Sequence, residues 1–331
     1  MSKILYAVQA TGNGHISRAR EIIPHLQNYG EVDVLISGRQ ADVNLPYLVK
    51  YKKRGLSYTF GRHGGIDFID SIKNLRPINL IKDIYTFPVN DYDLVLNDFE
   101  PVTSWACKVQ KKDCIALSHQ SAYLSKKTPR PKHQNNFAEW IFKNYAPTNF
   151  HYGFHFKSFD DFIYTPVIRN EVRSLEISNK DHITVYLPAH LDDILIKHFS
   201  KFNDVKFEVF SKHTKQSSKK GNVEITPINN EKFINSMASS DGVITAGGFE
   251  SVAEAIHLRK KVMVIPMHNQ YEQQCNAIAA RDIGVTKVQS IDSQFNKHLS
   301  SWLKYAMPPK IYYPDLTAKI ISEVMRKHLP N

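Results

Sequence analysis

Short apolar runs of strand length alternate with amphipathic segments of helix length through both halves of the chain. The chain opens with an apolar run at Ile4–Val8, a helix-like segment at Ile16–Tyr29 and a second apolar run at Val32–Ile36. The apolar residues of the middle segment recur on one helical face. A strand, a helix and a strand in this order form a βαβ unit, which predicts a parallel sheet and an α/β fold.

The same alternation continues to about residue 165. Strands are expected at Ser57–Phe60, Leu94–Leu96 and Cys114–Leu117, and a helix at Pro101–Val109 has its proline in the first turn, where proline is tolerated. The stretch Tyr164–Asn179 is polar and contains proline, which is typical of a linker. We therefore predict a first, Rossmann-like domain over residues 1–165 with a doubly wound sheet.

The alternation restarts at Ile183–Leu187 and predicts a second Rossmann-like domain over residues 175–314. The last segment, Asp315–His328, carries one apolar stripe and must pack on another surface. We expect this helix, residues 315–329, to pack back onto the first domain. The other elements expected in the second half are strands at Val205–Phe210, Val223–Ile225, Gly242–Thr245 and Val262–Ile265, and helices at Glu231–Ala238, Glu250–His257 and Gln270–Ile283.

The chain carries 43 Lys and Arg against 32 Asp and Glu, a formal net charge of +11. Such an excess indicates either an anionic partner or solvated basic loops. The segment Tyr123–Tyr145 mixes basic and aromatic residues, which suits contact with anionic lipid headgroups. No nucleic-acid-binding motif accompanies it, so no nucleic-acid partner is expected. The residues of this mixture are Lys126, Lys127, Arg130 and Lys132 with Tyr123, Phe137, Trp140, Phe142 and Tyr145.

Cysteine content and apolar run length indicate the compartment. Cys107, Cys114 and Cys275 are odd in number and widely spaced, which favours a reducing environment. No apolar run approaches the roughly 20 residues of a membrane-spanning helix, and the N-terminus reads as a strand rather than a signal peptide. We predict a cytoplasmic protein, with peripheral contact at the inner face of the membrane as a further expectation.

The segment at residues 241–255 is the strongest chemical signal in the sequence. A short strand leads into Gly247 and Gly248, and a helix begins near Phe249. A glycine pair lets a phosphate approach the backbone, and the helix N-terminus stabilises its negative charge. Glu250 or Glu254 on that helix is placed to accept hydrogen bonds from ribose hydroxyls. The alternative, a tight turn without a ligand, stays open on this segment alone.

Two further segments supply polar groups at expected strand ends. Residues 268–277 concentrate amide and carboxylate side chains after a parallel strand, where open α/β sheets bind ligands; they suit sugar hydroxyls or are simply surface polarity. The first turn contains Gly12, Gly14 and His15, but Ser17 stands where a dinucleotide fingerprint has its third glycine. We therefore expect no nicotinamide cofactor. His15 is either structural or a general base that Asp98, at another strand end, orients.

Together these segments resemble GT-B fold glycosyltransferases, especially MurG-type GlcNAc transferases and the wider UDP-glycosyltransferase group. The likeness implies two Rossmann-like domains that face each other across a cleft, with the acceptor in the first and the nucleotide sugar in the second. The matching motifs are Gly12-Asn-Gly-His15 in the first loop, Gly247-Gly248 with Glu254, and Pro266 followed by Glu272-Gln273 and Asn276-Ala277.

The resemblance implies a role for individual residues. His15 would be the general base on the acceptor hydroxyl and Asp98 its partner, while His119 and Glu100 are expected on the acceptor side and His119 is a reserve candidate for the base. Donor contacts are implied for Gly14 beside the donor, Gly247, Gly248, Phe249 and Ser251 at the diphosphate, Glu254 at the ribose, Glu272 and Gln273 at the sugar, and Pro227 and Ile228 at the base.

The predicted activity is inverting, metal-independent transfer of a sugar from a nucleoside-diphosphate sugar, expected to be a UDP-sugar, to an acceptor hydroxyl on a lipid-linked or cell-envelope glycan. No metal or other cofactor is expected, because Asp160-Asp161 and Asp192-Asp193 are adjacent pairs, typical of a turn and a helix start, and not an Asp-x-Asp motif. Two alternatives stay open: a nonhydrolysing nucleotide-sugar epimerase, and a catalytically inactive protein that binds nucleotides or glycans.

Overall fold

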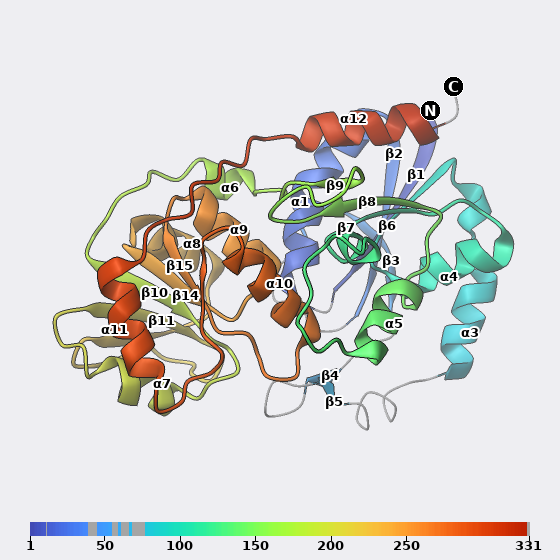
Figure 1. Ribbon diagram of the computed structural model, residues 1–331. Helices are drawn as coiled ribbons and strands as arrows, with labels where there is room; N and C mark the ends of the chain where they lie inside the picture. Colours follow the sequence, from blue (N-terminus) through green and yellow to red (C-terminus); the bar gives the residue numbers. More distant parts are fainter. Residues whose placement is uncertain (11, 39–44, 55–58, 61–65, 68–76, 330–331) are drawn as a thin grey trace.

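The computed structural model describes residues 1–329 except 11, 39–44, 55–58, 61–65 and 68–76 (Figure 1). It contains two seven-stranded sheets, one in each half of the chain, which confirms the predicted α/β class. Residues 57 and 58 of the expected strand Ser57–Phe60 lie outside the described residues. The remainder, β4 (Thr59–Phe60), pairs antiparallel with β5 (Ile66–Asp67).

The first sheet is parallel throughout and has the strand order β3-β2-β1-β6-β7-β8-β9. Its central strands are buried on both faces, which explains their continuous apolar runs. The strands are β1 (Ser2–Gln9), β2 (Gly30–Ser37), β3 (Val49–Lys53), β6 (Leu94–Asp98), β7 (Ile115–Ser118), β8 (Phe150–Phe154) and β9 (Ile163–Tyr164). The helices are α1 (Asn13–Gln27), α3 (Pro77–Thr86), α4 (Pro101–Gln110) and α5 (Asn136–Asn144), with 3-10 turns η1 (Val89–Asp91) and η2 (Gln120–Leu124).

The second sheet has the order β12-β13-β11-β10-β14-β15-β16 and is parallel except for β12 at its edge. Its strands are β10 (His182–Tyr186), β11 (Lys206–Ser211), β12 (Ser218–Lys220), β13 (Val223–Pro227), β14 (Gly242–Thr245), β15 (Lys261–Val264) and β16 (Thr286–Lys287). The helices of the second half are α6 (Asn170–Arg173), α7 (Asp192–Phe199), α8 (Asn230–Ser239), α9 (Phe249–His257), α10 (Tyr271–Arg281), α11 (Phe295–Tyr305) and α12 (Thr317–His328).

Both sheets reverse their strand order beside their first strand. In the first sheet, β1 lies between β2 and β6; in the second, β10 lies between β11 and β14. Ligands of open α/β sheets bind outside the carboxyl ends of the strands at such a reversal. His15 lies in the first turn of α1 after β1, Asp98 is the last residue of β6, and the loop after β14 carries Gly247 and Gly248. The topology therefore places these residues at the strand ends where open α/β sheets usually bind ligands.

The two halves are joined by more than the linker. The final helix, α12, returns from the second half and packs against α1 of the first (Figure 1). His328 near its end hydrogen-bonds the Tyr152 hydroxyl at 2.9 Å. The largest cluster of buried apolar side chains includes residues of both halves, among them Ile16, Phe154 and Phe249. The halves therefore form one packed molecule, with the loops of both sheets at their interface.

Candidate active site

His15 and Asp98 form a hydrogen-bonded pair at the edge of the first sheet. His15 lies in the first turn of α1, Asp98 is the last residue of β6, and Nδ1 is 2.8 Å from Oδ1. Asp98 is fully buried, whereas His15 keeps 11% of its side chain exposed. Because an ionised carboxylate only accepts hydrogen bonds, Nδ1 donates to Asp98, and in the neutral imidazole Nε2 is the nitrogen with a free lone pair. The arrangement has the form of a general base with its orienting carboxylate.

Arg18 is a third member of this cluster, and it is not among the residues predicted from the sequence. Its Nε and Nη2 donate to the two oxygens of Asp98 at 2.9 and 2.7 Å. Its Nη1 donates at 2.5 Å to Glu250, which comes from α9 of the second half. Burial alone would raise the pKa of Asp98, but the charges of Arg18 and then His15 outweigh it and hold that pKa below its usual value. Arg18 therefore keeps the buried carboxylate ionised.

The loop between β14 and α9 has the geometry expected of an anion site. Gly247 has φ of 87°, a conformation that favours glycine, and a Cβ there would lie 2.9 Å from Val264. Gly248 is the N-cap residue of α9, and no side chain caps this helix. Ser251, in the first turn, donates to the Gly248 carbonyl at 3.2 Å. The helix N-terminus can therefore bind a phosphate through its backbone N–H groups.

Glu254, predicted at the ribose, is occupied by a residue of the linker. Arg169 Nε and Nη2 donate to its two carboxylate oxygens at 2.5 and 2.8 Å, and both side chains are at least nine-tenths buried. Glu250 and Glu254 stand four residues apart on α9, so they share one face of the helix, and each meets an arginine from outside the second sheet. A ribose would have to use the remaining acceptor positions of Glu254.

The start of α10 brings the predicted sugar contacts to the interface between the halves. Glu272 accepts from Gln120 of η2 at 3.1 Å and stays partly exposed. Gln273 is buried, and its side-chain oxygen accepts from the backbone before α10 at 3.1 Å. Asn276 donates to the Gly247 carbonyl at 3.2 Å. These bonds hold the start of α10 beside the loop that precedes α9.

His119 and Glu100, predicted on the acceptor side, are both buried among protein partners. His119 stacks on Phe249 with ring centroids 3.9 Å apart, and its Nε2 is 2.9 Å from Asn276 Oδ1. Burial lowers the pKa of His119 and favours its neutral form. The Glu100 carboxylate caps α4 through the backbone N–H groups of Val102 and Thr103. We expected both side chains to face the acceptor. Instead, His119 contacts Asn276 of the second half, and Glu100 is the N-cap residue of α4.

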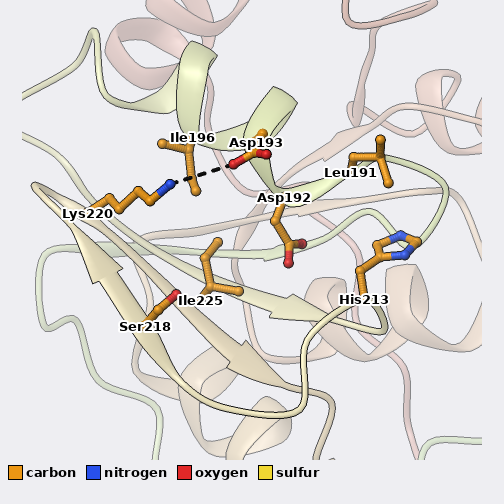
Figure 2. A pocket seen from close by; sticks show the side chains of 8 residues that line it. All are labelled: Leu191, Asp192, Asp193, Ile196, His213, Ser218, Lys220 and Ile225. Carbon is orange, nitrogen blue, oxygen red and sulfur yellow. Dashed lines mark ion pairs between the residues drawn. The ribbon is translucent and has the colours of Figure 1, made fainter.

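Pro227 and Ile228, predicted at the nucleotide base, end β13, and the Ile228 N–H donates to the Ser211 carbonyl at 3.0 Å. A hollow of about 320 Å³ lies nearby at the start of α7 (Figure 2). It is lined by Leu191, Asp192, Asp193, Ile196, His213, Ser218, Lys220 and Ile225. A larger hollow of about 1040 Å³ lies beside α8. Neither is lined by a residue predicted for the site, so the site is defined by contacts at the interface.

The segment Tyr123–Tyr145 is only partly a surface. Tyr123, Phe142 and Tyr145 are buried, whereas Phe137 and Trp140 are about half exposed. Two of its basic residues have acidic partners: Lys127 with Asp160 at 2.6 Å, and Arg130 with Glu139 at 2.6 Å. The prediction of one continuous basic and aromatic surface is therefore wrong for the buried rings, which pack in the core because α5 folds over η2.

Within the described residues, no three His, Cys, Asp or Glu side chains gather as a metal site. The pair Asp192-Asp193 begins α7, as predicted, and Asp160-Asp161 lies in a bend and turn. Among the helices that the structure describes, none has the length and apolar character to cross a bilayer.

The chain is similar to known proteins in its sequence family and in its structure. The model of glycosyl transferase family 1 matches residues 2–305. No curated protein matches in sequence. Similar solved structures include Acinetobacter baumannii MurG, with 11% identity, a TM-score of 0.59 and coverage of 98% of this chain and 99% of that one. They also include Arabidopsis thaliana UGT89C1 complexed with UDP (12%, 0.56, 98% and 95%) and a UDP-N-acetylglucosamine 2-epimerase (13%, 0.58, 98% and 96%). The architecture is the GT-B fold.

Proposed function

The chain belongs to glycosyl transferase family 1 and is a glycosyltransferase that uses a nucleotide sugar, and we propose that it transfers the sugar with inversion. The observation that carries the proposal is the His15–Asp98 pair at the carboxyl ends of strands β1 and β6. Arg18 links this pair to α9, the helix whose N-cap residue is Gly248. A base and an anion site thus meet at the domain interface, where a donor and an acceptor would react.

The proposed reaction is a single displacement. His15 Nε2 accepts the proton of the acceptor hydroxyl while the acceptor oxygen forms a bond to the anomeric carbon. The bond from that carbon to the diphosphate breaks, and the diphosphate leaves with the electron pair. Attack opposite the leaving group inverts the anomeric centre. Asp98, ionised and held by two bonds from Arg18, stabilises the imidazolium that forms.

The donor is proposed to lie along the loops of the second sheet. The uncapped start of α9 stabilises the departing diphosphate without a metal ion. A UDP-sugar is the favoured donor because a structurally similar protein is described as complexed with UDP. The proposed donor contacts are Gly14 beside the donor, Gly247, Gly248, Phe249 and Ser251 at the diphosphate, Glu254 at the ribose, Glu272 and Gln273 at the sugar, and Pro227 and Ile228 at the base.

The first test is release of free nucleoside diphosphate from UDP-, GDP- and dTDP-sugars, with and without EDTA. We expect turnover of a UDP-sugar that EDTA does not reduce. His15→Ala should lower kcat by about 10²- to 10⁴-fold, the usual contribution of a general base. Glu323→Ala, in a surface ion pair on α12, serves as the control and should behave as the unchanged protein. Absence of binding and turnover for every sugar nucleotide would refute the proposal.

An epimerase is the second candidate, favoured by the structural likeness to a UDP-N-acetylglucosamine 2-epimerase. An epimerase needs no acceptor and keeps the nucleotide on the sugar. The two activities are therefore separated by the products formed from the donor alone. An isomerised nucleotide sugar would identify the epimerase, whereas free nucleoside diphosphate and monosaccharide would identify a transferase that uses water as a poor acceptor.

We propose a lipid-linked or cell-envelope acceptor reached at an anionic membrane surface. Support comes from apolar side chains that the first domain leaves exposed: Phe137 and Trp140 on α5, and Ile78, Ile81 and Tyr85 on α3. Exposed Lys126 and Lys132 lie in the same segment as α5. Aromatic rings beside basic residues suit the headgroup region of a bilayer.

Vesicle binding tests this surface directly. We expect the unchanged protein to sediment with phosphatidylserine-containing vesicles and less with neutral ones. Trp140→Ser with Phe137→Ser, and separately Lys126→Glu with Lys132→Glu, should both lower the bound fraction. Tyr312→Ser removes an exposed ring elsewhere and is the matched control. Equal binding by all variants would exclude contact through α5.

A further inference from the structure

Glu250 brings a negative charge from the second half of the chain to the catalytic pair of the first. Its Oε1 lies 2.5 Å from Arg18 Nη1, and Arg18 in turn holds both oxygens of Asp98. Arg18 is 2% exposed and Glu250 is 22% exposed, so water screens this contact weakly. The contact joins α9, whose N-terminus is the proposed diphosphate site, to the proposed base.

The charges in this cluster do not cancel. Arg18 neutralises one carboxylate, so the pair Asp98 and Glu250 leaves one negative charge unmatched while His15 is neutral. When His15 takes the acceptor proton, the cluster becomes neutral. Without Glu250, Arg18 and Asp98 cancel each other, and the new imidazolium forms with the Arg18 charge only 3.2 Å from its Nδ1. Glu250 therefore favours protonation of His15.

Glycine at position 14 is required by the same contact. A Cβ on Gly14 would lie 2.3 Å from Glu250 Oε2, closer than two such atoms can approach. The obstructed atom is the far end of a flexible side chain, so an added methyl group would displace Glu250 and spare the backbone. The missing side chain at Gly14, in the first turn of α1, thus leaves room for Glu250 to reach Arg18.

We propose that Glu250 is a positioning residue that acts through Arg18 to strengthen His15 as a base, and that it does so only while the two domains are together. The inference rests on the proposed transferase function. Proton abstraction is thereby coupled to the placement of α9 against the first domain. An enzyme whose domains are apart holds a weaker base, which limits loss of the donor before the acceptor and donor meet.

The other groups packed around the cluster do not supply this charge. In the described structure, Tyr6 of β1, His119 after β7 and Phe154 of β8 also face it. Burial lowers the pKa of His119, so its imidazole stays neutral. Burial, followed by the charge of Asp98, raises the pKa of Tyr6, so its hydroxyl stays neutral. The Phe154 ring lies 5.8 Å from the Arg18 guanidinium and carries no charge. Arg18, Asp98 and Glu250 are therefore the charges that the test has to separate.

The test follows the titration of the His15 imidazole by NMR of histidine-labelled protein, with its signal assigned by loss in His15→Asn. In Glu250→Gln the midpoint should move to lower pH by about one unit, the size expected for one charge several ångström away. Gly14→Ala, which displaces Glu250, should move it in the same direction. Arg18→Gln should move it to higher pH. Glu323→Gln removes an equal charge on α12 and should leave the midpoint unchanged.

The pH dependence of donor turnover is the second readout. In Glu250→Gln, kcat should fall about tenfold near pH 7 while the acidic limb moves to lower pH, a combination that a loss of folded protein would not produce. An unchanged midpoint in Glu250→Gln, or an equal movement in Glu323→Gln, would overturn the inference. If the unchanged protein turns over no sugar nucleotide, the proposed function fails, and the titration still decides the coupling between Glu250 and His15.

Discussion

At the scale of single residues, Glu100 shows how a carboxylate beside a catalytic group can serve the backbone alone. Its oxygens accept from the Val102 and Thr103 N–H groups at 2.9 and 2.7 Å and from the Thr103 hydroxyl at 2.6 Å. We expect Glu100→Ala to lower the free energy of unfolding by about 1–2 kcal/mol, as loss of a helix cap does. Urea unfolding measures this, and the donor KM should stay unchanged.

The stability that Glu100 contributes should depend on pH. Burial, ahead of the hydrogen bonds from Thr103, raises the pKa of this carboxyl above its usual value. A carboxyl whose pKa is higher in the folded chain contributes its full stabilisation below the pKa that it has in the unfolded chain, about 4.3. That stabilisation is lost as the pH rises through the pKa in the folded chain. The difference in unfolding free energy between the unchanged protein and Glu100→Ala should therefore be larger at pH 4 than at pH 7. An equal difference at both would contradict the shift.

Single residues of the site are predictable when their position follows from the sheet. His15 and Asp98 come after neighbouring parallel strands, so both lie at the same edge. Arg18 is missed, although it stands three residues after His15 and so shares its helical face; that spacing is the signal that would have found it. Its partner Glu250 is 232 residues away, and only the packing of the two domains brings it there.

At the scale of elements, the turn between β14 and α9 depends on the backbone of Gly247. Its φ of 87° disfavours any side chain, and a Cβ would press on Val264 of β15 at 2.9 Å. We expect Gly247→Ala to shift the start of α9 and weaken UDP binding by tenfold or more, measured by calorimetry. Gly221→Ala is the control, because its φ of 60° is also positive but a Cβ there meets nothing within 4 Å. Equal UDP affinity in both variants would show that the turn does not shape the site.

Strands are predictable from the sequence where burial on both faces requires a continuous run of apolar residues. Strands such as β1 and β14 are buried on both faces and read as apolar runs. Strand β8 does not appear as an apolar run in the sequence, because His151 and Gly153 interrupt its apolar residues. Gly153 is needed there since a Cβ would lie 2.8 Å from the Ala122 backbone nitrogen of η2. The close contact between β8 and η2 therefore requires glycine at this position, and no local sequence pattern reveals that contact.

At the scale of the whole molecule, the interface between the domains combines a shared apolar cluster and ion pairs with a group of hydrogen bonds at α10. Asn276 Oδ1 contacts His119 Nε2 at 2.9 Å and accepts from the Tyr123 hydroxyl at 2.5 Å, both from the first half of the chain. Tyr271 donates to Glu139 of α5 at 2.7 Å. Polar contacts permit relative motion of domains more readily than a large apolar interface does. The hydrogen bonds at α10 are therefore a replaceable part of what holds the two domains together.

Asn276→Leu should separate the domains without unfolding either one. The change removes the Asn276 oxygen that both His119 Nε2 and the Tyr123 hydroxyl contact and leaves these two groups only their long mutual contact of 3.4 Å. A buried polar group left unsatisfied costs about 1–3 kcal/mol, which opening the interface relieves. We expect a larger radius of gyration by small-angle X-ray scattering and faster proteolysis within residues 165–181. Asn222→Leu is the control, because Asn222 makes three hydrogen bonds within the second half only.

The same variant links domain position to the chemistry of His15. Asn276 has its described hydrogen bonds with His119, Tyr123 and Gly247, so its loss changes no contact of the catalytic pair directly. If Glu250 acts only while the domains are together, Asn276→Leu should move the His15 titration in the same direction as Glu250→Gln. If UDP binds between α9 and the first domain, as proposed, its addition should restore both the compact shape and the original midpoint. A compact Asn276→Leu protein would show that Asn276 does not hold the domains together. An open Asn276→Leu protein whose His15 titrates as before would show that the strength of His15 as a base does not depend on domain closure.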